Sequence, residues 1–292
     1  MSPEDFFVEE IPGFAFTGEG EHACVFIEKT NLNTMDVVQA LARYAGVEPH
    51  AIGYCGLKDK NAQTRQWFSV CLQASRVDFS SFSLEGAHVL ETALHTRKLR
   101  RGDHRGNFFR ICLRDVVGEK SVIEERLFLM GYRGVPNYFG EQRFGREGNN
   151  LVEAERLFAR RRGKMRAFKQ RMYVSAARAW LFNQILAERV RQGNWNILLE
   201  GEQVEPQAPL WGRGRPGCAG PLFELENSVL QQWSSWCEWL EHCGLQQERR
   251  QTVLQPQQFS WAWQSQDLLL SFSLSGGQFA TSILRELLVE RP

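Results

Sequence analysis

The segment with the strongest chemical character is residues 53–67, which read GYCGLKDKNAQTRQW. Its single carboxylate, Asp59, stands between Lys58 and Lys60, and Arg65 follows six positions later. An ionised carboxylate beside cations can act as a nucleophile or as a base. An Asp before Lys-Asn is also a common turn residue, because its side chain hydrogen-bonds to the backbone that follows. The residues by themselves leave both interpretations open.

Three further segments combine polar residues with aromatic ones: residues 5–10 (DFFVEE), 106–109 (GNFF) and 276–281 (GGQFAT). Each could be an edge strand or a turn that buries a Phe. Together they offer an Asn amide, which can read the edge of a base through paired hydrogen bonds, and rings on which a base can stack.

Charge is segregated along the chain, although 35 Lys and Arg nearly balance 34 Asp and Glu. Residues 96–110 carry a net charge of +5 and residues 160–171 of +7, whereas residues 196–250 carry −4. Clustered cations on a neutral protein are typical of polyanion binding, because each neutralised phosphate releases counterions. For one run alone, a solvated helix face is the alternative. We therefore expect a nucleic acid partner whose backbone contacts Arg97, Lys98, Arg100, Arg101, Arg160, Arg161 and Arg162.

Composition excludes several classes of protein. With 43% hydrophobic residues the chain is an ordinary globular one, and its longest apolar runs are far below the ~18 residues of a membrane span. The first residues show no basic stretch followed by an apolar one, so we expect a cytoplasmic protein, and a monomer. The seven cysteines form no CxxC pair, which argues against structural zinc and favours a reducing compartment.

Hydrophobic spacing predicts the secondary structure of the first half. We expect strands over residues 21–29, 66–73 and 108–113, and a helix that begins at Asn33 or Thr34 and ends at Gly46. Ser121 and Glu124 predict a capping box for a further helix that ends at Gly131.

The second half is predicted to be helical first and β-rich later. A helix over residues 174–191 ends before Gly193, residues 202–220 form a loop, and a helix over residues 228–243 packs its tryptophans into the core. A period of two then predicts a strand over residues 268–274. This order suggests one domain inserted within another.

Residues 56–66, GLKDKNAQTRQ, resemble the GxKDxxAxTxQ signature of the TruD family of tRNA pseudouridine synthases. Six other motifs follow the family's order: SPEDFFVEE at 2–10, GEGEH at 18–22 with NT at 33–34, KLR at 98–100 with GN at 106–107, VPNYFGEQRFG at 135–145, SAAR at 175–178 with FNQ at 182–184, and FATS at 279–282 with RE at 285–286. The resemblance covers nearly the whole chain.

The resemblance implies an α+β fold. A pseudouridine synthase catalytic domain, built on a mixed, mainly antiparallel sheet, would take residues 1–133 and 255–292. A mostly helical inserted domain, the TRUD domain, would interrupt it over residues 134–254.

The resemblance also implies roles for individual residues. Asp59 would be the catalytic aspartate, and Phe109 would stack on the target base. Other substrate contacts would come from Phe6, Asn107 and Phe279, and the residues close to them would be Glu10, Lys58 and Lys60.

The implied reaction is the isomerisation of uridine to pseudouridine in tRNA, at uridine 13 of the D arm, without cofactor or metal. Such a reaction needs an enclosed site and a flipped nucleotide, so we expect Asp59 at the floor of a cleft. Asp59 would attack C1′ or abstract the 2′ proton, and both routes need its carboxylate form.

Two other functions were considered. A non-catalytic RNA-binding or RNA-folding protein could use the same scaffold, but it has no need of a carboxylate that faces anionic RNA. A sugar hydrolase needs two carboxylates at a defined separation, and this signature offers one.

Overall fold

The computed structural model describes residues 2–72, 77–160 and 168–287, and it divides into two compact units. The sheet unit comprises Met1–Val122 and Pro256–Gly277, and the helical unit comprises Ile123–Gln255 and Gln278–Pro292. The domain boundaries expected at 133/134 and 254/255 stay a prediction.

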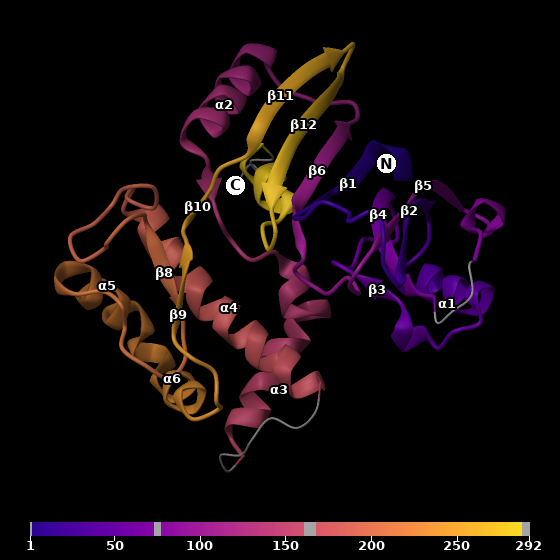
Figure 1. Ribbon diagram of the computed structural model, residues 1–292. Helices are drawn as coiled ribbons and strands as arrows, with labels where there is room; N and C mark the ends of the chain where they lie inside the picture. Colours follow the sequence, from indigo (N-terminus) through magenta and orange to yellow (C-terminus); the bar gives the residue numbers. More distant parts are fainter. Residues whose placement is uncertain (1, 73–76, 161–167, 288–292) are drawn as a thin grey trace. The chain divides into compact units, whose positions relative to one another are not determined.

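The sheet unit is built on eight strands (Figure 1). Their order is β11-β12-β6-β1-β4-β2-β5, with β3 paired to β4. Only β1 and β4 run parallel among the described strands of this sheet, so the predicted mixed, mainly antiparallel sheet is confirmed. The bounds are β1 Phe6–Pro12, β2 His22–Thr30, β3 Gly53–Tyr54, β4 Gln63–Cys71, β5 Ala87–His95, β6 His104–Leu113, β11 Gln257–Gln264 and β12 Asp267–Ser275.

One face of this sheet packs against helix α1 (Thr34–Ala45), and we call it the α1 face. Alternation along β2 and β4 directs Val25 and Phe68 into this core, where both are fully buried. The helix begins with a capping box at Asn33 and ends at Gly46, whose φ of 67° suits glycine, so the predicted helix is confirmed. Three short 3₁₀ helices complete the unit: η1 Pro3–Asp5, η2 Pro49–Ala51 and η3 Phe79–Ser81.

A histidine is buried without hydrogen-bonding partners on the opposite face. His95 on β5 lies opposite His22 on β2 and is 5% exposed, and within the described residues neither of its ring nitrogens has a partner. Its ring stacks on Phe14 at a centroid distance of 5.1 Å. Burial, and then the positive charge of Arg97, lowers the pKa of His95, and burial also lowers the pKa of His22.

We expect acid to destabilise the sheet unit through His95. Below about pH 6.5, the pKa of an unfolded histidine, the unfolded chain binds protons that the folded chain does not, so the free energy of unfolding falls until the pH passes the lowered folded pKa. Thermal melts across this range should show a shallower fall for His95→Phe than for the wild type. His88→Phe, at an exposed histidine on the same strand, should keep the wild-type slope. An equally steep fall in His95→Phe would contradict the assignment.

The helical unit has an apolar core that includes Leu181, Phe182 and Leu240. Its helices are α3 Asn149–Phe158, α4 Phe168–Arg191, α5 Gly220–Leu230, α6 Ser234–Glu241 and α7 Ala280–Leu287, and most of α2 (Lys120–Arg133) belongs to it. Two short antiparallel pairs join β7 (Val135–Pro136) to β10 (Val253–Leu254) and β8 (Gln207–Leu210) to β9 (Glu248–Gln251). The 3₁₀ helices are η4 Glu141–Phe144, η5 Arg146–Gly148 and η6 Gln231–Trp233.

Three local predictions were wrong in this region. The expected loop over residues 202–220 contains β8, whose partner β9 lies about forty residues away in the sequence and gives no local signal. The expected helix over residues 228–243 is the end of α5, then η6, then α6. Ser121 lies inside α2, so it is not the cap that was expected at its start. The helix ends at Arg133 instead of Gly131, and the glycine that follows it, Gly134, has a positive φ of 74°.

Within the described residues, no helix is both long and apolar enough to cross a membrane. All seven cysteines are free thiols.

Candidate active site

A buried lysine holds the loop that carries Asp59. We call residues 56–60, which connect β3 to β4, the Asp59 loop. Lys29, on the α1 face, is 0% exposed, and its Nζ donates to the carbonyl of Asp59 at 2.9 Å and to that of Leu32 at 2.6 Å. Burial lowers the pKa of Lys29 to about 8, and the negative charge of Asp59 opposes this shift. Lys29 is therefore a cation electrostatically coupled to Asp59.

Two buried polar side chains hold the rest of the loop. Thr34 Oγ1 accepts from the amide of Lys58 at 2.9 Å and donates to Gln66 Oε1 at 2.9 Å. Gln66 Nε2 donates to the carbonyl of Gly56 at 3.1 Å. Thr34 is 1% exposed and Gln66 0%. Together with Lys29, they fix the main chain at three positions of the loop.

An ion pair joins the loop to β1. Lys58 Nζ lies 3.0 Å from Glu10 Oε2, and the two side chains are 6% and 1% exposed. The other oxygen, Glu10 Oε1, accepts from the amide of Trp67 at 3.2 Å. Lys58 and Glu10, both expected near the substrate, are thus in contact with each other, and the charge of Lys58 is directed to Glu10. Arg65, considered as a partner of Asp59, instead binds Glu28 at 2.7 Å and Glu9 at 3.0 Å.

Asn107 lies directly opposite Glu10, on the neighbouring strand β6. Its Oδ1 is buried and has no hydrogen-bonding partner in the described part of the chain. A buried acceptor without a donor costs about 1–3 kcal/mol. The amide oxygen of Asn107 therefore keeps an unused acceptor position next to Glu10.

Rings from three strands lie on the same face. The ring of Phe6 meets the ring of Phe109 edge-on at 6.3 Å, and Phe109 stacks on Phe272 at 5.4 Å. Phe272 covers one face of the Phe109 ring, and Phe109 is 7% exposed. Phe6 is half-buried. The predicted residues of β1 and β6 thus gather beside the Asp59 loop.

Asp59 itself is an exposed residue, and so is Lys60. The residues of the sheet unit therefore do not enclose the carboxylate, and the expected cleft stays a prediction. The physical reason is that the buried side chains bind the backbone of the loop and leave the Asp59 side chain projecting from it.

Phe279 belongs to the helical unit, where it is half-buried and packs against Phe139 at a centroid distance of 6.1 Å. Its meeting with Asp59 stays a prediction.

The first basic segment adjoins the Asp59 loop, because the amide of Gly102 donates to the carbonyl of Cys55 at 2.9 Å. Its side chains are held by local contacts. Arg97 binds Asp103 at 2.8 Å, Arg101 donates to the hydroxyl of Tyr54 at 3.0 Å, and Lys98 donates to the carbonyl of His50. Of the four residues of this segment that are expected to contact the RNA backbone, Arg97, Arg100 and Arg101 are exposed and Lys98 is half-buried. In the second basic segment Arg160 is exposed, whereas Arg161 and Arg162 lie outside the described residues.

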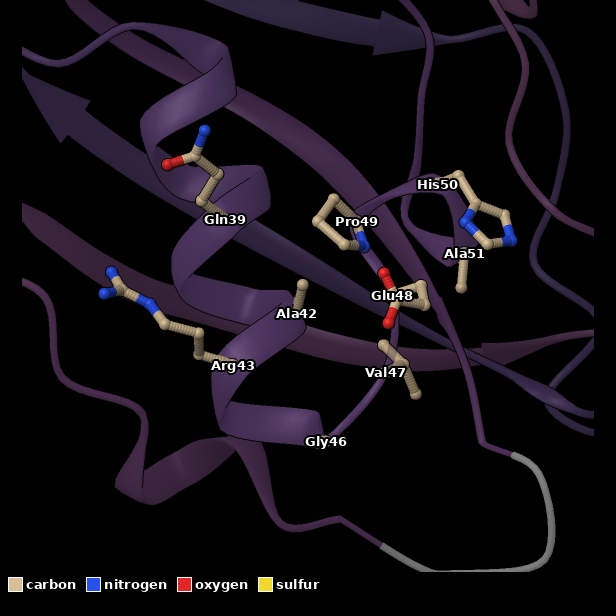
Figure 2. Close-up of a pocket in the computed structure, with 9 residues that line it drawn as sticks. All are labelled: Gln39, Ala42, Arg43, Gly46, Val47, Glu48, Pro49, His50 and Ala51. Atoms are coloured by element: carbon tan, nitrogen blue, oxygen red, sulfur yellow. The ribbon is translucent and has the colours of Figure 1, made fainter.

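Figure 2 shows a hollow elsewhere in the sheet unit, with a volume of about 620 Å³. Its lining comes from the end of α1 and from the segment that follows it, and includes Arg43, Glu48 and His50. None of the predicted site residues lines it.

Sequence reasoning missed Lys29, Thr34 and Gln66 as site residues. The sequence carries a signal for two of these three residues. Lys29 lies two positions after Ile27 and Gln66 two positions before Phe68, so each points to the same buried side of its strand as that residue. A lysine or a glutamine in the buried phase of a strand needs a specific partner.

The chain is similar in sequence to known proteins along almost its whole length. Residues 1–160 match the model of the family "tRNA pseudouridine synthase D (TruD)". The chain is 48% identical over 292 residues to the tRNA pseudouridine synthase D of Cellvibrio japonicus, covering 98% of this chain and 87% of that one. It is 42% identical to the enzyme of the same name from Methylococcus capsulatus, with 98% and 89% covered.

The fold is also that of a solved structure. A crystal structure from Methanosarcina mazei, assigned as a tRNA pseudouridine synthase D, superimposes with a TM-score of 0.75 at 22% identity, covering 100% of this chain and 93% of that one. From the two sequence relatives and the family match, the chain belongs to the TruD family of tRNA pseudouridine synthases.

Proposed function

We propose that this protein isomerises uridine to pseudouridine in tRNA, at uridine 13 of the D arm, and that Asp59 is its catalytic carboxylate. One observation carries the proposal: buried side chains fix the backbone of the Asp59 loop at three positions, while the Asp59 side chain stays exposed. A fixed backbone under an accessible carboxylate is what a group acting on a bound ribose requires.

The reaction rearranges atoms without adding any. The bond from C1′ to N1 breaks, the base turns, and a bond from C1′ to C5 forms, while C5 loses a proton and N1 gains one. The base must leave the helical stack, because C1′ and the base edge are inaccessible within it. The exposed position of Asp59 supports a site that the flipped nucleotide itself completes.

Asn107 and Phe6 would hold the base while it turns. The unpartnered Oδ1 of Asn107 suits the N3–H of uracil, a donor that the cytosine ring lacks at this position. Phe109 would stack on the base, and the half-buried ring of Phe6, which meets Phe109 edge-on at 6.3 Å, would extend the stacking surface. Stacking of one base is worth about 1–3 kcal/mol. Phe279 would add a contact from the helical unit.

The basic segment next to the loop would bind the tRNA backbone. Three of its exposed cations, Arg97, Arg100 and Arg101, would contact phosphates and so position the substrate without reading its sequence.

The test is incubation with unmodified tRNA transcripts, followed by mapping of pseudouridine at each position. We expect one product site, at position 13, and none in a transcript in which this uridine is replaced by cytidine. Tight tRNA binding without pseudouridine at any position would overturn the proposal in favour of a non-catalytic RNA-binding protein.

A substitution at Lys29 tests whether the loop must be held. Lys29→Met keeps the apolar stem but removes the donor to the carbonyls of Asp59 and Leu32, so the loop loses a contact at its catalytic residue. We expect kcat to fall by about 10–100-fold, because a small displacement of a catalytic group is costly, with KM nearly unchanged.

The matched control is Lys120→Met. Lys120 also donates to a backbone carbonyl, that of Ser265 at 2.8 Å, but it is exposed and lies on another segment. Its activity should equal that of the wild type. A folded Lys29→Met protein with the wild-type kcat would show that this contact does not position Asp59.

A further inference from the structure

A β-bulge in β6 turns a histidine toward the candidate active site. On β1 the paired positions Ile11 and Pro12 follow each other directly. Their partners on β6, Gly106 and His104, are two residues apart. The extra residue of a bulge changes the side of the strand to which the next side chain points. His104 therefore lies opposite Pro12, on the side of the sheet that also carries Glu10, two positions before Pro12.

The ring of His104 borders the start of the Asp59 loop. A methyl group at Gly56 would lie 3.6 Å from Cε1 of His104 and 3.7 Å from Nζ of Lys58. A methyl group at Gly276, just after β12, would lie 3.7 Å from Nε2 of the same ring. His104 is half-buried, and it thus packs against two glycines of the sheet unit and beside the ammonium that pairs with Glu10.

The charged groups around His104 come from three segments: Glu10 on β1, Lys58 on the Asp59 loop and Asp103 just before β6. Burial lowers the pKa of His104, the negative charge of Glu10 opposes this shift, and the positive charge of Lys58 adds to it. The Cys55 thiol next to the loop is neutral, because burial raises its pKa to about 12. His104 is therefore a neutral ring at neutral pH, in the field of both members of the ion pair.

A positive charge on this ring would have no acceptor at one of its nitrogens. Nδ1 of His104 is buried and has no hydrogen-bonding partner among the residues that the structure describes. Both nitrogens of an imidazolium carry a proton, and a buried donor without an acceptor is costly. The imidazolium would also repel Lys58 and compete with it for the carboxylate of Glu10.

We propose that neutral His104 is a positioning residue of the active site: it packs against Gly56 and leaves Lys58 paired with Glu10, so that the Asp59 loop keeps its active geometry. His104 acts through these neighbours and not on the substrate. Protonation would weaken the ion pair that joins the loop to β1. The inference rests on the proposed function for the catalytic role of the loop.

The pH dependence of kcat tests this role. Wild-type kcat should be constant above about pH 6.5, the ordinary pKa of histidine, and should fall about tenfold per pH unit below the lowered pKa of His104, with KM nearly unchanged. His104→Gln is polar and takes up no proton, so its kcat should stay level where that of the wild type falls. His104→Ala, which removes the ring from Gly56, should lower kcat about tenfold at every pH. A wild-type acid fall in His104→Gln would overturn the inference.

Two further histidine variants separate this effect from unfolding. His88→Gln, at an exposed histidine on β5, should keep the wild-type pH profile of kcat. His95→Phe, which removes the acid destabilisation expected of the sheet unit, should keep it as well. If the fall in kcat disappeared in His95→Phe instead, it would report unfolding, and the inference would be wrong.

An NMR titration of the His104 ring tests the contact without an activity assay. The midpoint should rise in Lys58→Met and fall in Glu10→Gln, because each variant removes one of the two charges that act on the ring. An unchanged midpoint in both variants would overturn the inference while leaving the proposed function standing. Both expected shifts in a protein that makes no pseudouridine would support the contact and remove the proposed function.

Discussion

Asp59→Asn is expected to lower pseudouridine formation by at least about 10³-fold, the loss typical of removing a catalytic carboxylate. The amide can neither attack C1′ nor abstract the 2′ proton, so both routes are blocked. We expect tRNA affinity to stay within about tenfold of the wild type, since phosphate contacts supply most of it. Single-turnover assays with mapped product, alongside a binding titration, measure the two quantities.

The structure indicates that Asp59→Asn removes the carboxylate without disturbing the fold of the loop. The loop is held through the backbone carbonyl of Asp59, which the substitution leaves in place, and the exposed side chain has room for an amide. Loss of activity would therefore report chemistry and not misfolding. Asp78→Asn, at another exposed aspartate of the sheet unit, should be fully active. An Asp59→Asn protein with wild-type turnover would disprove the catalytic assignment.

The largest expected effect on stability comes from Arg189 in α4. It is 0% exposed and lies 2.7 Å from Glu202, which is also buried, and it donates to the carbonyls of Asn194, Ile197 and Gln207. Arg189→Met leaves the buried Glu202 carboxylate without its counter-cation, although the amides of Leu199 and Gln207 still donate to it, and it removes the donor to these carbonyls. We expect the free energy of unfolding of the helical unit to fall by about 3–5 kcal/mol.

Denaturant unfolding of variants on the same helix tests this expectation. Arg191→Met, which removes an exposed pair with Glu188, should cost less than about 1 kcal/mol. The double variant Arg189→Met with Glu202→Leu should recover part of the loss, because it removes the uncompensated charge as well. Equal effects of Arg189→Met and Arg191→Met would show that burial does not set the energy of this pair.

Much of the sheet unit could be predicted from local patterns, because alternation and capping are local. The helix from Thr34 to Ala45 was predicted from its cap and its glycine, the strand at 21–29 from its β-rich composition after a glycine turn, and the strand at 268–274 from its period of two. The polar residues of the site also lie at buried positions of their strands. Glu10 follows the buried Val8 by two positions, and Lys29 follows the buried Ile27 by two. That Glu10 and Lys29 both contact the Asp59 loop depends on the pairing of β4 with β1 on one side and with β2 on the other, which no local pattern encodes.

The helical unit was predicted less well for the same reason. Its short strands β8 and β9 pair across a long sequence separation, and Arg178 on α4 binds the carbonyls of Leu210 and Trp211. Such contacts order a stretch that contains Pro and Gly. Because the partners are distant in the sequence, the local composition of the stretch does not indicate them. The exposure of Asp59 was unpredictable as well, because it follows from which atoms of the loop the buried side chains bind.

The position of β12 in the sheet has a consequence for how the chain folds during synthesis. This strand pairs with β6, yet more than a hundred and fifty residues separate the two partners in the sequence. The ribosome must release the whole intervening unit before the sheet can close, and such high contact order slows folding. Phe109 gains Phe272 beneath its ring only at that late stage, so a truncated nascent chain would carry Asp59 long before it has a finished binding surface.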